Sequence, residues 1–120
     1  MFTDCDFALD TLVRKMKKPG LGCIVSFIGI VRAGNAIKGM EIAMDEKKVK
    51  TELESRKREA LAKFEIESVE IVHRKGSLDV GDSIVAILVG AGHRKDAFRA
   101  CEYLIDVLRV SESIRMKELK

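Results

Sequence analysis

The chain has 120 residues, of which 47% are hydrophobic and 34% are charged, with five Phe, one Tyr and no Trp. This length predicts one domain over residues 1–120 with a core of its own. The formal net charge of +3 is too small to require nucleic acid as a partner and fits an anionic small ligand or an acidic protein patch. The few aromatic residues also supply little for a platform on which nucleic-acid bases could stack.

The N-terminal part predicts a helix over residues 6–17, with Asp4 or Asp6 as its cap. The sequence KKPGLG at 17–22 ends this helix, because it combines lysines with proline and glycine. The apolar residues of this helix recur on one face: Leu9, Leu12, Val13 and Met16.

An acidic start and the lack of an apolar run long enough to cross a bilayer argue against a signal peptide and a membrane span. We therefore expect a cytoplasmic protein without a membrane partner.

Residues 23–31 (CIVSFIGIV) are apolar, β-branched and few, which predicts a strand buried on both faces. Residues 40–44 predict a second strand. The following segment, 46–63, predicts a solvated helix whose charged residues pair at i,i+4 spacing, for example Glu52 with Arg56.

The second half of the chain continues the alternation of strands and helices. Residues 66–74 predict a half-buried strand, 75–82 a loop, and 83–91 a strand buried on both faces. The last long helix is expected over 92–109. The order α-β-β-α-β-β-α, followed by a short C-terminal segment, predicts an α+β fold with one mainly antiparallel sheet packed against helices. The inward side of the last helix is expected to carry Phe98, Cys101, Ile105 and Leu108.

The three cysteines, Cys5, Cys23 and Cys101, are odd in number and have no C-x-x-C spacing. A disulfide framework or a zinc site is therefore not expected, and free thiols in a reducing compartment fit the pattern. Phosphate-binding, dinucleotide and zinc-protease motifs are absent from the sequence. We expect neither a metal nor a cofactor.

Arg32 is the first candidate for chemistry, because it ends the buried strand and opens a glycine-containing loop. Its guanidinium could clamp an anion or a carboxylate in a bidentate manner. The alternative is an ordinary solvated arginine at a strand end, which is the more common situation.

The second candidate is the sequence GAGHRKDAF, where a buried strand meets the start of a helix. Free N–H groups at a helix start favour an anion, and His93 and Arg94 would lie beside it. Alternatively, His93 is only a neighbour of the helix cap. For the pair His73 and Arg74, toward the end of the expected strand 66–74, a structural role is favoured.

The C-terminal segment, LRVSESIRMKELK at 108–120, is basic. It is either a frayed terminus or a segment that folds back and adds cations to an anion pocket.

Taken together, GCIVSFIGIVR, VEIVHRKGSLDVGD, GHRKDAFRACEYLIDVLR and the closing MKE resemble the large, catalytic subunit of molybdopterin synthase. That family shows a G-A-x-V-x-F-x-G-x-V-R strand, an I-x-H-R-x-G-x-L-x-x-G-[DE] hairpin, an H-R-x-x-A-F-x-A-C helix start and a W-K-K-E segment. The match runs from about residue 20 to residue 118 in the same order and spacing.

The resemblance implies an enzyme that transfers sulfur into cyclic pyranopterin monophosphate and so makes the dithiolene of molybdopterin. The sulfur donor is a thiocarboxylate on the Gly-Gly tail of a small ubiquitin-like carrier subunit. The large subunit is expected to form a homodimer with a carrier at each end, a heterotetramer, in which the carrier tail enters a basic pocket that also binds the precursor's phosphate.

Carried over by position, the resemblance assigns site residues on three segments of the chain. Arg109 stands where the family has a lysine late in the long helix, and Lys117 stands beside the position of the second lysine, where it could supply an amine. These two are the expected catalytic residues. The expected substrate-binding residues are Phe27, Arg32, His93, Arg94 and Arg115.

The departures from the family pattern concern the two lysines. Their positions read Arg109 and Met116, the tryptophan position reads Arg115, and the usual extension after the segment is missing. Arginine keeps the charge but cannot act as an amine base, and methionine can do neither. Lys117 could substitute only if the segment shifts its register, because one step along an extended segment turns the side chain to the other face. The alternative is a non-catalytic paralogue that keeps the fold, the dimer and the pocket.

Overall fold

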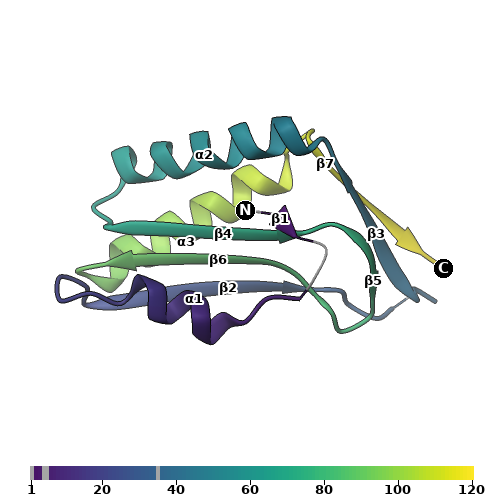
Figure 1. Cartoon of the computed structure of the whole chain (residues 1–120), viewed down its shortest axis with the longest axis horizontal. Coiled ribbons are helices and arrows are strands. Elements are labelled where there is room, and N and C mark those ends of the chain that lie inside the picture. Colours follow the sequence, from purple (N-terminus) through teal and green to yellow (C-terminus); the bar gives the residue numbers. More distant parts are fainter. Residues whose placement is uncertain (1, 4–5, 35) are drawn as a thin grey trace.

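The computed structural model describes residues 2–3, 6–34 and 36–120, and Figure 1 shows how its elements are arranged. Within these residues, no helix is both long enough and apolar enough to cross a membrane. In chain order the elements are β1 Phe2–Thr3, α1 Leu9–Met16, β2 Cys23–Ile30, β3 Gly39–Met44, α2 Glu46–Lys63, β4 Ser68–Arg74, β5 Gly76–Asp79, β6 Ser83–Ala91, α3 Arg94–Arg109 and β7 Ile114–Leu119.

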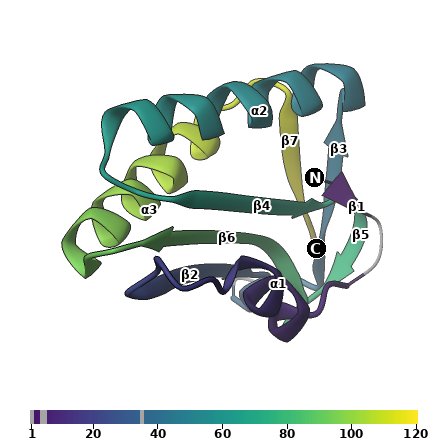
Figure 2. The same cartoon turned by 60° about the vertical axis from the view of Figure 1, so that its left-hand side comes forward.

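Four strands form the main sheet in the order β1-β4-β6-β2. β6 pairs antiparallel with both β2 and β4, whereas β1 pairs parallel with β4. Helix α1 lies on one face of this sheet, and α2 and α3 lie on the other (Figure 2). β4 and β6 are the central strands of this sheet, and β6 has helices on both faces, which explains its nearly continuous apolar sequence.

Two apolar clusters fill the spaces on either side of the main sheet. The larger cluster joins α2 and α3 to the sheet and includes Leu53, Ile71, Ile87 and Leu104 among its fully buried side chains. The smaller cluster packs α1 on the opposite face through Leu12 and Met16. Alternate residues of a strand point to opposite faces, so each central strand contributes to both clusters.

A second sheet of three strands has the order β5-β3-β7 and is antiparallel throughout. It stands at the end of the main sheet where β4 ends and β6 begins (Figures 1 and 2). The C-terminal segment is therefore a paired strand and not a frayed end. Residues Ile114–Leu119 pair with β3 along its whole length.

The α+β class with antiparallel strands packed against three helices is confirmed, but the single sheet expected from the sequence is wrong. The strands β1, β5 and β7 were not expected as strands. β5 is four residues long and falls in a segment rich in turn residues, and β7 has a single buried residue, Ile114. Both are strands because β3 lies between them and supplies the hydrogen bonds.

Three local expectations are corrected by the packing. β2 is an edge strand with half-buried residues, and Ile30 is 55% exposed, so this strand is not buried on both faces. Phe98 points outward and is 60% exposed. Arg56 pairs with Glu59 at 3.0 Å and not with Glu52.

The start of α1 also differs from the expectation. Its cap is Ala8, without a side-chain hydrogen bond. Asp6 instead accepts a hydrogen bond from the backbone N–H of Phe7, and Asp4 lies outside the described residues.

The turn before β2 requires a glycine at one position. A Cβ on Gly22 would lie 2.1 Å from the carbonyl oxygen of Gly92. The Gly22 N–H also donates to the carbonyl of Ala91 at 2.9 Å. This contact ties the start of β2 to the end of β6, directly before α3 begins.

Candidate functional site

A cleft opens between the end of β2, the last turns of α3 and the second sheet. Its volume is ≈ 640 Å³. We call it the Arg109 cleft, because Arg109 lies in it at the point where α3 ends. The lining residues are Phe27, Ile28, Gly29, Ile30, Arg32, Ile37, Met40, Ile105, Arg109 and Glu118.

The cleft continues inward as a narrow apolar extension of ≈ 150 Å³. The two spaces adjoin, because Phe27, Gly29, Ile105 and Arg109 line both of them. The extension ends between α3, the strands of the main sheet and β7. Its further lining residues are His73, Ile84, Val85, Ile87, Leu108 and Met116.

Arg32 is fixed at its base and free at its head, as the sequence suggested. The neighbouring Val31 is buried, donates to the carbonyl of Asp82 at 2.9 Å and accepts from the N–H of Gly81 at 2.8 Å. The side chains of Arg32 and Arg109 are exposed in the cleft. Among the described residues, neither guanidinium has a carboxylate within 4 Å. Both are therefore available for an anionic ligand.

The register of β7 decides which of its side chains reach the cleft. Met116 stands opposite Ile42 and Glu118 stands opposite Met40. Both residues of β7 line the cleft or its extension. Because side chains alternate along a strand, they share the inner face of the second sheet.

Arg115 and Lys117 lie on the outer face of the same strand. Lys117 stands opposite Glu41, Arg115 stands opposite Ala43, and neither lines the cleft. The expectation that these two side chains join the pocket is thus corrected by the strand geometry: no register shift brings Lys117 inward. The same alternation brings in Glu118, which was not among the expected site residues.

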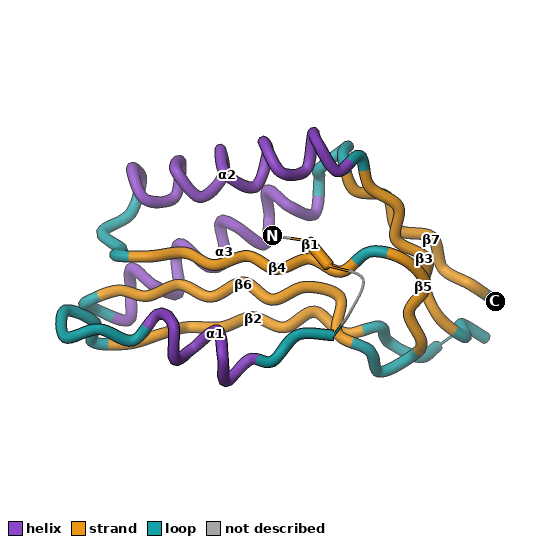
Figure 3. The backbone as a smooth tube through the Cα atoms, in the orientation of Figure 1, coloured by secondary structure: helices purple, strands orange, loops and turns teal. Residues whose placement is uncertain are grey.

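His93 and Arg94 lie at the opposite end of α3 from Arg109. His93 is the cap residue of α3 and Arg94 is its first residue, which confirms the expected helix start. At about 1.5 Å per residue, Arg94 and Arg109 are roughly 22 Å apart along the helix axis. Figure 3 shows this helix running from the far end of the main sheet to the second sheet. Within one chain, the structure brings together Phe27, Arg32 and Arg109 but not the His93–Arg94 pair.

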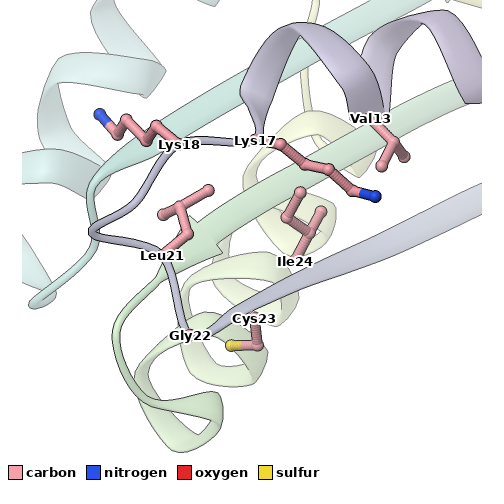
Figure 4. Close-up of a pocket in the computed structure, with 7 residues that line it drawn as sticks. All are labelled: Val13, Lys17, Lys18, Leu21, Gly22, Cys23 and Ile24. Atoms are coloured by element: carbon pink, nitrogen blue, oxygen red, sulfur yellow. The ribbon is translucent and has the colours of Figure 1, made fainter.

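A separate pocket of ≈ 580 Å³ lies between the end of α1 and the start of β2. Val13, Leu21 and Ile24 supply apolar walls, and the ammonium groups of Lys17 and Lys18 point in opposite directions (Figure 4). None of the residues expected to form the functional site lines this pocket. One anion cannot be held by both lysines in this arrangement.

The described cysteines and acidic residues offer little alternative chemistry. Cys101 is buried, and burial raises the pKa of its thiol to about 11, so it remains protonated and poorly nucleophilic. Cys23 is half buried and its thiol lies 3.7 Å from the carbonyl oxygen of Ala91. In the described part of the chain, no group of three or more His, Cys, Asp or Glu residues is placed to hold a metal ion.

Comparison with known proteins identifies the family of the chain. The model of the MoaE protein family matches residues 2–111. The chain belongs to the MoaE family. The molybdopterin synthase catalytic subunit of Pyrococcus abyssi is 33% identical over 118 residues, which cover 95% of this chain and 79% of that protein.

Solved structures of MoaE relatives share the fold. The crystal structure of molybdopterin synthase from Staphylococcus aureus has a TM-score of 0.93 at 27% identity and covers 98% of this chain and 88% of that chain. A complex of subunits 1 and 2 of the molybdopterin-converting factor from Helicobacter pylori has the same fold at 20% identity, with a TM-score of 0.83 and coverage of 98% and 82%. These matches confirm the predicted family and fold, and with them the predicted enzyme class, a sulfurtransferase.

Proposed function

We propose that the Arg109 cleft transfers sulfur from a thiocarboxylated ubiquitin-like carrier to cyclic pyranopterin monophosphate. The observation that carries this proposal is the pair of unpaired guanidiniums, Arg32 and Arg109, at the two sides of a cleft with a narrow apolar extension. Such a site suits a peptide tail without side chains that ends in an anion and enters the extension, together with a second anion bound in the outer cleft. The Gly-Gly thiocarboxylate and the precursor's phosphate have these properties.

In this arrangement Arg109 binds the thiocarboxylate, because it lines both the cleft and the extension. Arg32 binds the precursor's phosphate at the outer part of the cleft. Phe27 packs against the tail from the floor. Glu118 faces the same space, where its carboxylate disfavours anions at any position except those next to the arginines.

The amine expected at Lys117 is not part of this cleft in a single chain. Met116 occupies the inner position, and Lys117 faces outward beside Glu41. A catalytic role for Lys117 remains a hypothesis that requires a ligand or a partner on the outer face of the second sheet. The proposal therefore assigns binding to the arginines and leaves proton transfer to another group in the cleft.

We further propose that a second copy of the chain supplies His93 and Arg94. Both side chains are exposed and lie too far from Arg109 to reach its ligand within one chain. In a symmetric dimer, each copy can place this end of α3 beside the other copy's cleft. The resulting assembly is a homodimer with one carrier at each end, a heterotetramer.

Mixing two inactive variants tests the shared site. Arg109→Met and His93→Ala would each abolish most activity as pure proteins. After unfolding and refolding together, half of the dimers are mixed and carry one intact site, so roughly a quarter of the wild-type activity returns. Recovery of no activity would show that each site is built within one chain.

Reconstitution tests the function itself. The purified protein is mixed with thiocarboxylated carrier and cyclic pyranopterin monophosphate, and molybdopterin is detected as its fluorescent oxidised derivative. A rate proportional to protein concentration supports the proposal. No product, with the carrier still bound, would overturn it in favour of the non-catalytic paralogue that keeps the docking surface.

The cytoplasmic location remains a prediction from the sequence.

A further inference from the structure

His73 is the buried polar side chain of the described core, with 4% of its surface exposed. It lies near the end of β4, opposite Val85 of β6. Its side chain shares a face with Val69 and Ile71, which pack toward α2 and α3. Burying an imidazole costs free energy that a valine or isoleucine would not. Packing alone therefore does not account for a histidine at this position.

The protonation state of the ring follows from its one hydrogen bond. Nδ1 lies 2.8 Å from the carbonyl oxygen of Arg74. A carbonyl oxygen can only accept, so Nδ1 carries the hydrogen, and in the neutral ring Nε2 has a free lone pair. Burial lowers the pKa of His73, more than the backbone hydrogen bond raises it. The ring is thus held as a neutral base in a fixed tautomer.

The same ring lines the apolar extension of the Arg109 cleft, together with Phe27, Arg109 and Met116. Among the residues that line the extension, the others are aliphatic, aromatic, glycine, methionine or arginine. Arginine keeps its proton at physiological pH, and the remaining side chains exchange none. His73 is therefore the group in the extension that can accept and return a proton near neutral pH.

We propose that His73 is the general base that frees the transferred sulfur from the carrier, an inference that rests on the function proposed above. After the thiocarboxylate sulfur has bonded to the precursor, it still carries the carrier's acyl group. Water then attacks the acyl carbon: its oxygen forms the new C–O bond, and its proton goes to Nε2 of His73. The C–S bond breaks, the sulfur leaves as a thiolate on the precursor, and the imidazolium returns the proton to that sulfur. The carrier leaves as a carboxylic acid, which ionises in solvent.

This role supplies what the lysine positions of the chain lack. Arg109 can hold the acyl end and stabilise negative charge on it, but it cannot take a proton, and Met116 can do neither. General-base assistance by a positioned histidine contributes about 10²–10⁴-fold to the rate. The charged side chains that line the cleft and its extension are Arg109 at the junction and Arg32 and Glu118 in the outer cleft.

The kinetic test compares wild type with His73→Gln, whose amide can still donate to the carbonyl of Arg74. Single-turnover rates with thiocarboxylated carrier and precursor are measured from pH 5 to pH 8. Wild type is expected to lose rate as the pH falls through the titration of the imidazole. The variant is expected to be about 10²-fold slower, without this acidic limb, and to accumulate carrier joined to the precursor. An unchanged rate and pH profile in His73→Gln would overturn the proposal.

A second measurement does not depend on the folding of His73→Gln. The chain has only two histidines, so ¹⁵N spectra of the imidazoles in the wild-type protein hold two sets of signals, and His93→Gln identifies the set of His73. At pH 7 we expect His73 with hydrogen on Nδ1 and a free Nε2, and a shift of its signals when thiocarboxylated carrier is added. An Nε2-protonated ring, or signals that do not respond to the carrier, would overturn the proposal.

The two proposals fail in different ways. If wild type makes no molybdopterin, the sulfur-transfer function fails and the role of His73 fails with it. If wild type is active and His73→Gln equals it, only the role of His73 fails. Carrier binding and urea unfolding of His73→Gln serve as controls, because a loss of rate with both unchanged separates catalysis from folding.

Discussion

Replacing Arg109 with Met should weaken the hold of the cleft on the carrier's tail while leaving the fold intact. Met has a length similar to the arginine stem, and Arg109 is exposed at the last position of α3. The change therefore removes the guanidinium and little packing. It tests whether the arginine at this junction recognises the terminal carboxylate or thiocarboxylate.

The expected magnitude follows from the exposure of the side chain. A hydrogen bond to a charged partner contributes about 1.5–3 kcal/mol, and a bidentate pair could contribute more. Because Arg109 is solvated before binding, we take the value of a single bond. This corresponds to roughly 10–150-fold weaker binding of the tail. Arg109→Lys keeps the charge but loses the planar fork, so its loss should lie between wild type and Arg109→Met.

The assay is a double-mutant cycle with the carrier. Dissociation constants are measured for wild type and Arg109→Met, each with the intact carrier and with a carrier that lacks its last two glycines. The arginine and the tail should be coupled, so Arg109→Met should have little effect on the truncated carrier. Arg99→Met is the matched control, because Arg99 is exposed on the same helix and does not line the cleft. Equal losses with both carriers, or an equal loss in Arg99→Met, would contradict a specific contact between Arg109 and the tail.

Three further predictions concern other parts of the chain. Lys117→Ala should change the sulfur-transfer rate by less than about threefold, because exposed side chains away from a site contribute little; loss of most of the rate would return Lys117 to the mechanism. Gly22→Ala should lower the free energy of unfolding, measured in urea, by about 2–4 kcal/mol, because its Cβ would meet a backbone oxygen. Gly20→Ala is the control: no atom of the described residues, apart from its chain neighbours, lies within 4 Å of its added Cβ, so its free energy of unfolding should stay within about 0.5 kcal/mol of wild type. Burial lowers the pKa of His73, so protonation of its ring favours the unfolded chain. The stability that the neutral ring contributes is present above the pKa of the unfolded chain, about 6.5, and is lost as the pH falls below it. His73→Gln should lack that component, and identical slopes of stability against pH below 6.5 would contradict this.

The order of the main elements could be predicted because it depends on local pattern. The helices over 46–63 and 94–109 and the strand over 83–91 carry long periodic or apolar sequences. The short strands β1, β5 and β7 could not be predicted, since each exists only through pairing with a strand distant in the sequence. The exposure of Phe98 near the start of α3 could not be predicted either. Phe98 follows the apolar period of the helix, but it is 60% exposed because no element among the described residues covers it.

Only part of the residue set that lines the candidate site could be predicted from the sequence. Motif resemblance selected Arg32, Arg109 and Phe27, which the fold does bring into one cleft. It also selected Lys117, which lies on the other face of its strand. The residue that sequence reasoning set aside as structural, His73, lines the inner end of that cleft. The sequence around a histidine near a strand end does not reveal how deeply its ring is buried.

The family and the fold class follow from the sequence, because both depend on residue types and on their spacing along the chain. Which side chains share one space depends instead on how the chain folds in three dimensions. The register of β7 against β3 turns Met116 inward and Lys117 outward. The length of α3 separates His93 from Arg109. Both outcomes depend on the pairing and packing of segments far apart in sequence, where a shift of one residue moves a side chain to the opposite face of a sheet.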